Sequence, residues 1–365
     1  MPELKYQRAP SPKPGRIDVW AEANGERVSE LELLDMPTRL ARATIWTAGI
    51  ANVFTHEAHR RNGYAKALME HTHEHLRHEG YAMAALFGIP GFYPQFGYAT
   101  IGCDFRLEVE TRVAEQARGQ HRVQPARQRD LPAVARIFNA ANQHLNGSIV
   151  RDPARWTGLR FGSTLLGTKG LSVAVDPQDQ PLGFIAIAAR PTEVNVTDGA
   201  FRDPAVAPSL VAQAVAEAVK RRVETIGFHL HPEFGLGSYV RRLDSRLTSV
   251  RTHDARYMAR ILDQDTLLAA VEPALRARAA AYGGKAPARL RIRTALGTTT
   301  LRLKSRGDER TISLPPRRLT QLLFGYWSAA EVATAAGVRV AKQDLPWLAA
   351  LFPRGDAFCY GTDEY

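Results

Sequence analysis

The segment from Asn52 to Ala65 constrains this chain more than any other part of its sequence. A short apolar strand, Ile50 to Phe54, leads into a loop with the pattern Arg60-x-x-Gly63-x-Ala65, which opens a helix. At a helix start the free backbone N–H groups converge and the helix dipole favours negative charge, so such a loop can hold a pyrophosphate. Gly63 allows the backbone to approach the phosphates closely, and a guanidinium such as that of Arg60 can grip phosphate oxygens in bidentate fashion.

A second motif follows at a fixed distance. The helix from Tyr64 to about Glu79 ends at Gly80, and a short apolar strand, Tyr81 to Phe87, comes next. The chain then reads Phe92-Tyr93-Pro-Gln-Phe96-Gly97-Tyr98. A phenol such as that of Tyr93 can donate a proton to a sulfur anion and regain it from solvent.

Together the two motifs resemble the acetyl-CoA site of the GNAT acetyltransferase superfamily, Arg/Gln-x-x-Gly-x-Gly/Ala followed by Phe-Tyr-x-x-Phe-Gly-Phe/Tyr. In that family the pantetheine arm lies between two splayed parallel strands and pairs with the first of them, and the tyrosine protonates the leaving thiolate. The resemblance makes Tyr93 the expected general acid and Tyr98 a structural residue. It also implies contacts with acetyl-CoA by Val53, Phe54, Thr55, Arg60, Arg61, Asn62, Gly63, Tyr64, Ala65 and Lys66.

Length and composition limit the broad class of protein. A chain of 365 residues predicts two or three domains, and 45% hydrophobic residues are enough for real cores. The sequence has no run of eighteen apolar residues and no signal-peptide pattern at its start. Two cysteines, Cys103 and Cys359, form no metal framework. We therefore expect a soluble cytoplasmic protein without a metal.

The net charge of +11 is unevenly distributed along the chain. Residues 1–120 contain 14 lysines and arginines against 15 acidic residues, whereas residues 121–365 contain 34 against 22. A basic half can indicate a nucleic-acid binder. Because the arginines are scattered and no nucleic-acid-binding motif accompanies them, we do not expect nucleic acid to be the partner.

The first expected domain covers residues 1–120. A possible strand at Leu4 to Arg8 is followed by Ile17 to Ala23 and Val28 to Leu34, and Asn24-Gly25 predicts a hairpin between the last two. GNAT domains place one or two helices after their first strand, whereas the proline-rich segment 9–15 cannot be helical. Those helices wall the acceptor groove, so either the groove is open or the chain lacks its natural N-terminus.

The second expected domain covers residues 121–258. Val123 to Phe138 predicts a strand and a helix with Asp130 as N-cap, and a hairpin and the helix Pro208 to Val223 follow. This order resembles a second GNAT fold. No Arg-x-x-Gly-x-Gly/Ala pattern precedes its helix, so we expect a degenerate copy with a structural role.

The third expected domain covers residues 259–365. A helix at Asp263 to Tyr282, three short strands and short helical segments resemble a sterol-carrier-protein-like domain. The whole order then resembles the Eis (enhanced intracellular survival) family of GNAT N-acetyltransferases. The expected fold is α+β: tandem GNAT folds, each with a mixed, splayed central sheet flanked by helices, followed by the sterol-carrier-like domain.

The Eis resemblance also implies an unusual catalytic base. In that family the terminal carboxylate of the chain enters the active site of the first domain. Carried over, the α-carboxylate of Tyr365 accepts the amine proton, while Glu364 and Asp363 attract a cationic amine. The amine then attacks the thioester in a ternary complex, backbone N–H groups near Val53 polarise the carbonyl, and Tyr93 protonates the thiolate.

The acceptor is therefore expected to be a primary amine, such as an aminoglycoside, a polyamine or a lysine side chain, and the family suggests hexamers or trimers of dimers. Two alternatives stay open: a non-catalytic acyl-CoA or lipid sensor, and a basic nucleic-acid binder. The sequence His71-Thr-His-Glu74-His75 matches an inverted zincin pattern. No third ligand accompanies it, so an exposed, pH-sensitive helix face is the preferred interpretation.

Overall fold

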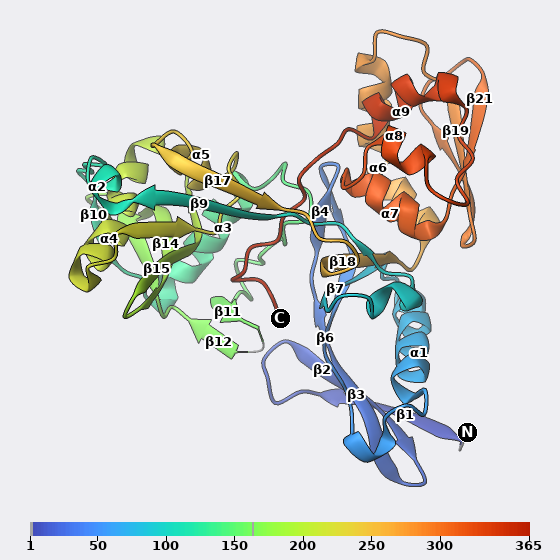
Figure 1. The fold of residues 1–365 in the computed structure, drawn as a ribbon, viewed down its shortest axis with the longest axis horizontal. Helices are drawn as coiled ribbons and strands as arrows, with labels where there is room; N and C mark the ends of the chain where they lie inside the picture. Colours follow the sequence, from blue (N-terminus) through green and yellow to red (C-terminus); the bar gives the residue numbers. More distant parts are fainter. Residues whose placement is uncertain (1–2, 163) are drawn as a thin grey trace. The chain divides into compact units, whose positions relative to one another are not determined.

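The computed structural model describes residues 3–162 and 164–365 (Figure 1). The chain forms two compact units, each built from two separate segments. The first unit joins the chain up to Gly102 with Thr252–Ala357, and the second joins Cys103–Arg251 with Phe358–Tyr365. No helix in the described part of the chain is long and apolar enough to cross a membrane.

The first unit contains a seven-stranded mixed sheet. Across the sheet the strands are β1 (Leu4–Pro10), β2 (Arg16–Ala23), β3 (Glu26–Asp35), β6 (Thr47–Thr55), β7 (Met83–Gly88), β18 (Arg256–Ile261) and β8 (Ala99–Thr100). Asn24 and Gly25 have φ of 53° and 82°, as a two-residue hairpin loop between β2 and β3 requires. β1 pairs directly with β2, and no helix lies between them in the described chain, as the prolines predicted.

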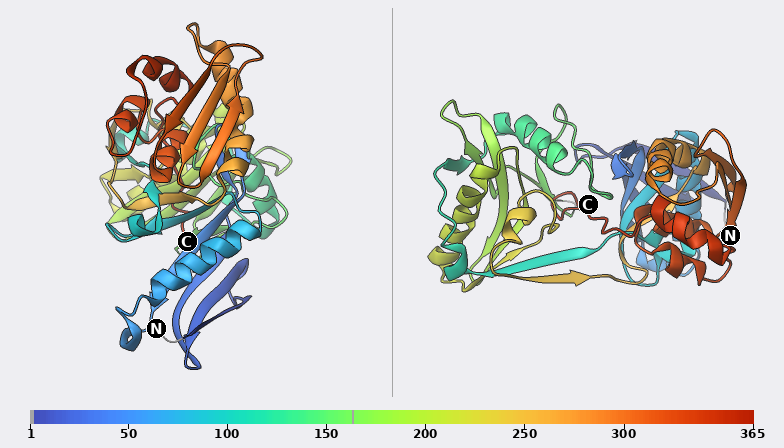
Figure 2. Two further views of the ribbon diagram at one scale, coloured as in Figure 1. Left: turned by 90° about the vertical axis from the view of Figure 1, so that its right-hand side faces the viewer. Right: turned by 90° about the horizontal axis from the view of Figure 1, so that it is seen from above.

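Helix α1 (Tyr64–His78) covers this sheet and runs beside its strands (Figure 2, left). Its buried side chains include Leu68, Met69 and Leu76, which join one core with residues of β2 and β3. Leu76 follows Leu68 by eight positions and Met69 by seven, so all three side chains lie on one face of the helix. The helix predicted from Tyr64 to about Glu79 is therefore confirmed.

The second unit repeats the same architecture. Its seven-stranded sheet has the order β10 (Arg122–Pro125), β13 (Leu171–Val175), β14 (Pro181–Arg190), β15 (Glu193–Phe201), β16 (Thr225–Phe228), β9 (Asp104–Glu110) and β17 (Ser245–Val250). In both sheets the fourth and fifth strands run parallel and all other neighbours run antiparallel. The expected tandem GNAT fold is confirmed by this shared order and direction. The main helices of the second unit are α3 (Leu131–Ala141) and α4 (Ala207–Arg221).

Each sheet includes one strand that is adjacent in sequence to a strand of the other sheet. β9 follows β8 along the chain but pairs in the second sheet, between β16 and β17. β18 follows β17 but pairs in the first sheet, between β7 and β8. The division into domains at residues 120 and 258 remains a prediction from sequence. The pairing adds that residues 256–261 complete the first sheet.

The rest of the first unit forms a smaller α/β layer. Helix α6 (Gln264–Ala281) packs on the three-stranded sheet β20-β19-β21, with β19 (Arg289–Thr294), β20 (Gly297–Arg302) and β21 (Glu309–Ser313). Helices α7 (Pro316–Phe324), α8 (Ala329–Ala333) and α9 (Leu345–Leu351) follow. Short elements complete the chain: β4 (Thr38–Leu40), β5 (Ala43–Ile45), α2 (Thr111–Ala114), β11 (Leu159–Phe161), β12 (Thr164–Gly167) and α5 (Gly237–Val240), with 3₁₀ turns at Glu57–His59, Tyr93–Phe96, Gln128–Asp130, Pro204–Val206 and Lys342–Asp344.

Candidate functional site: an open strand edge, a helix start and a tyrosine

Strands β6 and β7 are parallel neighbours for only three residue pairs. Thr47–Gly49 pairs with Met83–Ala85, and the ladder ends there although β6 continues to Thr55. The register of β6 with β3 shifts beside Asn52, whose φ is 49°, so β6 has a bulge at this point. Strand β6 therefore separates from β7 before it reaches Val53. An extended molecule can pair with the β6 edge there.

One side chain of β3, that of Glu32, fixes the bulge. Glu32 accepts hydrogen bonds from Lys13, Arg16 and Asn52. Burial raises the pKa of Glu32, but these hydrogen bonds outweigh it and hold that pKa below its usual range. Glu32 is thus charged at neutral pH and orients the Asn52 side chain.

The loop after β6 brings the chain into α1 through two left-handed residues. Arg61 has φ of 65°, and Gly63, the N-cap residue, has φ of 78°. Gly63 has no side chain that could cap the helix. The first N–H groups of α1, which have no acceptor within the helix, therefore remain able to donate to a ligand. Arg60, Arg61, Asn62 and Gly63 are exposed, as is Lys66 in the first turn of the helix. An exposed, basic, uncapped helix start suits an anionic ligand.

Tyr93 opens the 3₁₀ turn Tyr93–Phe96 at the end of the loop that follows β7. The side chain is half-buried and lies edge-on against Phe92, with ring centroids 5.0 Å apart. Burial raises the pKa of Tyr93 above its ordinary value of 10.0. The phenol is therefore protonated at neutral pH, which is the form that a proton donor needs.

Gly88, the last residue of β7, sets where this ring lies. A Cβ added at Gly88 would lie 2.8 Å from Cδ2 of Tyr93 and 2.6 Å from Sδ of Met258 on β18. We expect Gly88→Val to displace the Tyr93 ring and to lower turnover at least tenfold, while ligand binding at the α1 start changes little. Steady-state kinetics beside a direct binding titration measure the two effects, and an equal loss in both would contradict the local displacement.

A buried polar network supports the Tyr93–Tyr98 element from below. Arg260 of β18 donates from Nη1 to Nδ1 of His73 at 2.9 Å and to the carbonyl of Phe96 at 2.6 Å. Nε2 of His73 then carries the proton and donates to the hydroxyl of Tyr98 at 2.8 Å. Tyr98 is fully buried, in agreement with its expected structural role. His73 was not predicted, although its position four after Met69 and three before Leu76 places it on the buried face.

The network makes a prediction for stability against pH. Burial, and then the charge of Arg260, lower the pKa of His73 from 6.5 to about 3. The unfolded chain binds a proton at this histidine below pH 6.5 and the folded chain does not, so stability is lost as pH falls from about 6.5 towards 3. Between pH 6 and 4 we expect unfolding free energy to fall about 1.4 kcal/mol per pH unit faster than in His73→Gln. Urea titrations measure this, and parallel slopes would contradict it.

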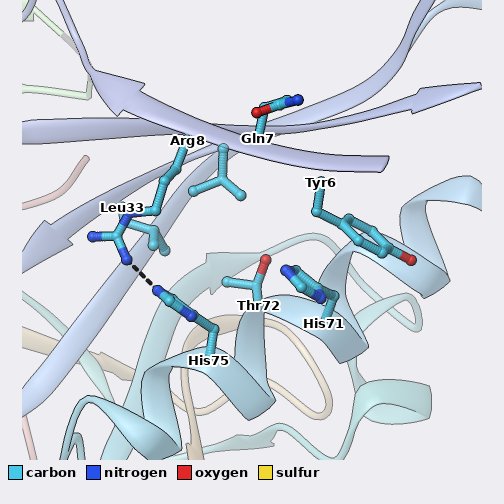
Figure 3. A pocket seen from close by; sticks show the side chains of 8 residues that line it. Tyr6, Gln7, Arg8, Leu33, His71, Thr72 and His75 are labelled. Carbon is cyan, nitrogen blue, oxygen red and sulfur yellow. Dashed lines mark hydrogen bonds between the residues drawn. The ribbon is translucent and has the colours of Figure 1, made fainter. Parts of the chain in front are cut away.

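The helix face with the zincin-like pattern has other partners. Glu74 pairs with Arg77 at 2.7 Å and with His78 at 2.8 Å on the exposed side. His71 stacks on Tyr6 with ring centroids 3.8 Å apart, and Arg8 donates to His75, at a pocket of about 170 Å³ between β1 and α1 (Figure 3). Throughout residues 3–162 and 164–365, no three His, Cys, Asp or Glu side chains are grouped as metal ligands.

The second repeat differs from the first at the edge of its fourth strand and at the start of the helix that follows. Where β15 leaves β16, the N–H of Leu236 donates to the carbonyl of Gly199 at 2.9 Å, so the strand edge is already paired. In the 3₁₀ turn Pro204–Val206, which leads directly into α4, the carboxylate of Asp203 accepts the N–H of Ala205 at 2.9 Å. A carboxylate this close to the start of α4 repels phosphate and already occupies one of the N–H groups there. The second repeat is therefore degenerate in structure as well as in sequence.

The C-terminal residues belong to the second unit. Phe358, Cys359, Tyr360 and Thr362 are buried there, and Glu364 and Tyr365 are half-buried. The carboxylate of Asp363 pairs with Arg151 at 2.8 Å, and its side chain is only 8% exposed. The predicted cofactor residues and Tyr93 thus lie together in the first unit, while Asp363, Glu364 and Tyr365 lie in the second.

Comparisons with known proteins agree with this geometry. Residues 2–101 match the acetyltransferase (GNAT) domain family, and residues 271–360 match the sterol carrier protein domain family. No curated protein sequence matches the chain.

Solved structures share the fold over nearly the whole chain. A GCN5-related N-acetyltransferase from Anabaena variabilis superposes with a TM-score of 0.74 at 18% identity, covering 94% of this chain and 88% of its own. One from Kribbella flavida gives 0.72 at 19%, covering 95% and 87%. Eis1 from Mycobacterium abscessus gives 0.62 at 16%, covering 95% and 90%. Residues 2–101 thus belong to the acetyltransferase (GNAT) domain family and residues 271–360 to the sterol carrier protein domain family, and the chain shares its overall fold with Eis1.

Proposed function

We propose that this acetyltransferase transfers the acetyl group of acetyl-CoA to a primary amine, of the aminoglycoside, polyamine or lysine type, in a ternary complex. The observation that carries the proposal is the open edge of β6 beyond Gly49, with an uncapped basic helix start after this strand and a protonated Tyr93 in the loop after the neighbouring strand β7. An acyl-CoA has the matching parts: a pyrophosphate, an amide-bearing arm and a thioester.

The cofactor contacts follow from this placement. Val53, Phe54 and Thr55 pair with the pantetheine arm, since their strand edge has no partner in β7. The start of α1 and its loop, Arg60, Arg61, Asn62, Gly63, Tyr64, Ala65 and Lys66, hold the pyrophosphate.

In the proposed mechanism the amine loses a proton to the α-carboxylate of Tyr365 and attacks the thioester carbon. A C–N bond forms, the C–S bond breaks, and Tyr93 protonates the departing thiolate. Backbone N–H groups near Val53 stabilise the carbonyl oxygen as it becomes negative. Glu364 attracts the cationic amine, with a smaller contribution from Asp363 because Arg151 neutralises its charge.

Thiol release from acetyl-CoA in the presence of a panel of amines tests the proposal. The panel contains an aminoglycoside, spermidine and a lysine peptide, and mass spectrometry identifies the acetylated product. We expect thiol release to depend on the amine and to match the acetylated product in amount. Release of thiol without any acetylated amine would overturn the proposal in favour of hydrolysis, and tight acetyl-CoA binding without release would favour the sensor alternative.

We expect one acetyl-CoA site per chain, because the second repeat pairs its strand edge with Leu236 and places the Asp203 carboxylate in the turn before its helix. Isothermal titration should give one molar equivalent of acetyl-CoA. Arg61→Glu should weaken binding at least tenfold, because it places a negative charge at the pyrophosphate and removes a charge-assisted hydrogen bond of about 1.5–3 kcal/mol. Arg77→Glu, at the other end of α1, is the matched control. A second equivalent of acetyl-CoA would contradict the prediction.

The cellular setting is also a proposal. An acetyl-CoA-dependent enzyme works where acetyl-CoA is supplied, so we place the protein in the cytoplasm. The resemblance to Eis suggests a homo-oligomer, a hexamer or a trimer of dimers. Light scattering during size-exclusion chromatography distinguishes these forms from the 40.3 kDa monomer.

A further inference from the structure

The second unit buries a whole arginine side chain among groups of the C-terminal tail. Arg151 is 2% exposed. Its Nη2 donates to Asp198 Oδ2 at 2.6 Å and to Asp363 Oδ2 at 2.8 Å, and its Nε donates to Asp363 Oδ1 at 3.0 Å. The hydroxyl of Thr362 donates to the same oxygen of Asp198 at 2.9 Å. The tail thus contributes two of the four side chains in this cluster, which we call the Arg151 clasp.

Such a cluster is a costly way to add stability. Desolvation of a buried ion pair can exceed the attraction between its charges, and apolar residues of the same volume often serve stability equally well. Here one guanidinium is shared by two carboxylates, and its Nη1 has no hydrogen-bond partner among the residues that the structure describes. In some proteins, buried polar or charged groups of this kind are kept because they fix one register of the chain. The arrangement fixed here is the position of residues 362 and 363.

Further contacts hold the tail in one register. The N–H of Phe358 donates to the carbonyl of Asn146 at 2.9 Å, and the hydroxyl of Tyr360 donates to Asn142 Oδ1 at 3.0 Å. The N–H of Arg160 on β11 donates to the carbonyl of Thr362 at 3.0 Å. A shift by a single residue would break all of these bonds together with the clasp. Tyr365 is two residues beyond Asp363, so its backbone carboxyl carbon lies within about 7 Å of the Asp363 backbone.

The clasp uses the strand that corresponds to the cofactor strand of the first repeat. The register of β15 with β14 shifts between Val196 and Asp198, as that of β6 with β3 shifts beside Asn52. Asp198 stands just after the bulge of the fourth strand, two residues beyond Val196, the last residue that pairs with β16. Ala51 has the same place relative to β7 in the first repeat, shortly before the residues proposed to meet pantetheine. In the second repeat this stretch contacts the chain's own C-terminal peptide.

We propose that the degenerate second repeat is a receptor for the chain's own C-terminal peptide, and that Arg151 is a positioning residue that sets where the Tyr365 carboxylate can act. The second part of this inference rests on the proposed function, in which that carboxylate is the base. Arg151 itself touches neither cofactor nor amine in this mechanism. Its effect on the reaction passes through Asp363.

The clasp is tested first without any reference to catalysis. Asp363→Asn keeps the shape of the tail and the Arg151–Asp198 pair but removes one charge of the clasp. We expect carboxypeptidase to release Tyr365 and Glu364 from this variant at least tenfold faster than from the full wild-type chain. Asp356→Asn, outside the tail segment, is the matched control. Arg151→Lys, which loses the forked geometry, should accelerate release as well. Equal release rates in all four proteins would overturn the inference.

A double-mutant cycle then tests the role in the reaction. Asp363→Asn should lower kcat for amine acetylation at least tenfold and leave KM for acetyl-CoA within twofold. When the Tyr365 carboxylate is replaced by a carboxamide, the same substitution should have no further effect on kcat. Faster tail release with an unchanged kcat would overturn the positioning role, as would full additivity in the cycle. If the wild-type chain acetylates no amine, the proposed function fails while the protease result still decides whether the receptor exists.

Discussion

Replacing the α-carboxylate of Tyr365 by a carboxamide is expected to lower kcat for amine acetylation by about 10²–10⁴-fold, the usual contribution of a positioned general base. Intein-mediated ligation of an amidated C-terminal peptide makes this change without touching any side chain. The Arg151 clasp and the buried tail residues stay intact, so the tail keeps its place in the second unit. The amine must still lose a proton to become a nucleophile, and the amide cannot accept it.

Two companion variants separate the carboxylate from the side chain that bears it. Tyr365→Phe keeps the terminal carboxylate and should retain kcat within about threefold. Addition of two glycines after Tyr365 moves the carboxylate by up to about 7 Å and should be as damaging as the amide. Dissociation constants for acetyl-CoA should agree within twofold in all four proteins. Full activity of the amidated enzyme would exclude the terminal carboxylate as the base.

Tyr93→Phe should lower kcat by about 10²–10³-fold with little change in acetyl-CoA affinity. A thiolate that leaves without a proton is a poorer leaving group, and a positioned acid contributes about 10²–10⁴-fold. The ring of Phe fills the same space against Gly88 and Phe92, so the packing of the loop is kept. Tyr81→Phe, which removes a phenol that donates to Asp35, is the matched control.

The pH profile tests the same residue independently. Because burial raises the pKa of Tyr93 above 10.0, the wild-type enzyme should keep its acid protonated and lose activity only above pH 10. Tyr93→Phe has no group to titrate there, so its kcat should lack this alkaline decline. Single-turnover measurements isolate the chemical step from product release. A decline of the same pH midpoint in both proteins would assign it to another group.

Much of the first repeat could be predicted because its features are contiguous in sequence. The Asn24-Gly25 loop, the helix after Gly63 and the strand before Gly88 were all correct to within two or three residues. Asp130 was predicted as a helix N-cap, and it is the residue before α3. Its carboxylate instead accepts the N–H of Arg127 at 2.8 Å, because a 3₁₀ turn precedes the helix. The site residues themselves remain predictions, now with known surroundings.

The features that the sequence did not reveal join residues far apart in the chain. Strands β9 and β18 each pair in the sheet of the other repeat. A local hydrophobic pattern cannot predict this pairing, because it gives no information about which distant strand is the neighbour. His73 and Arg260 are separated by 187 positions, and Arg151 and Asp363 by 212. Leu236 closes the second repeat from a loop that carries no motif.

By itself the sequence predicted the local features: a helix that starts at a glycine beside basic residues, a tyrosine in the loop after the next strand, and a second repeat without the Arg-x-x-Gly-x-Gly/Ala pattern. These depend on backbone conformation over a few residues, where glycine, proline and hydrophobic period decide the outcome. Only the tertiary structure decided which strands complete each sheet and which charges are buried together. Those choices are made by long-range pairing and desolvation, whose free energies depend on which distant groups meet and which of them lose water.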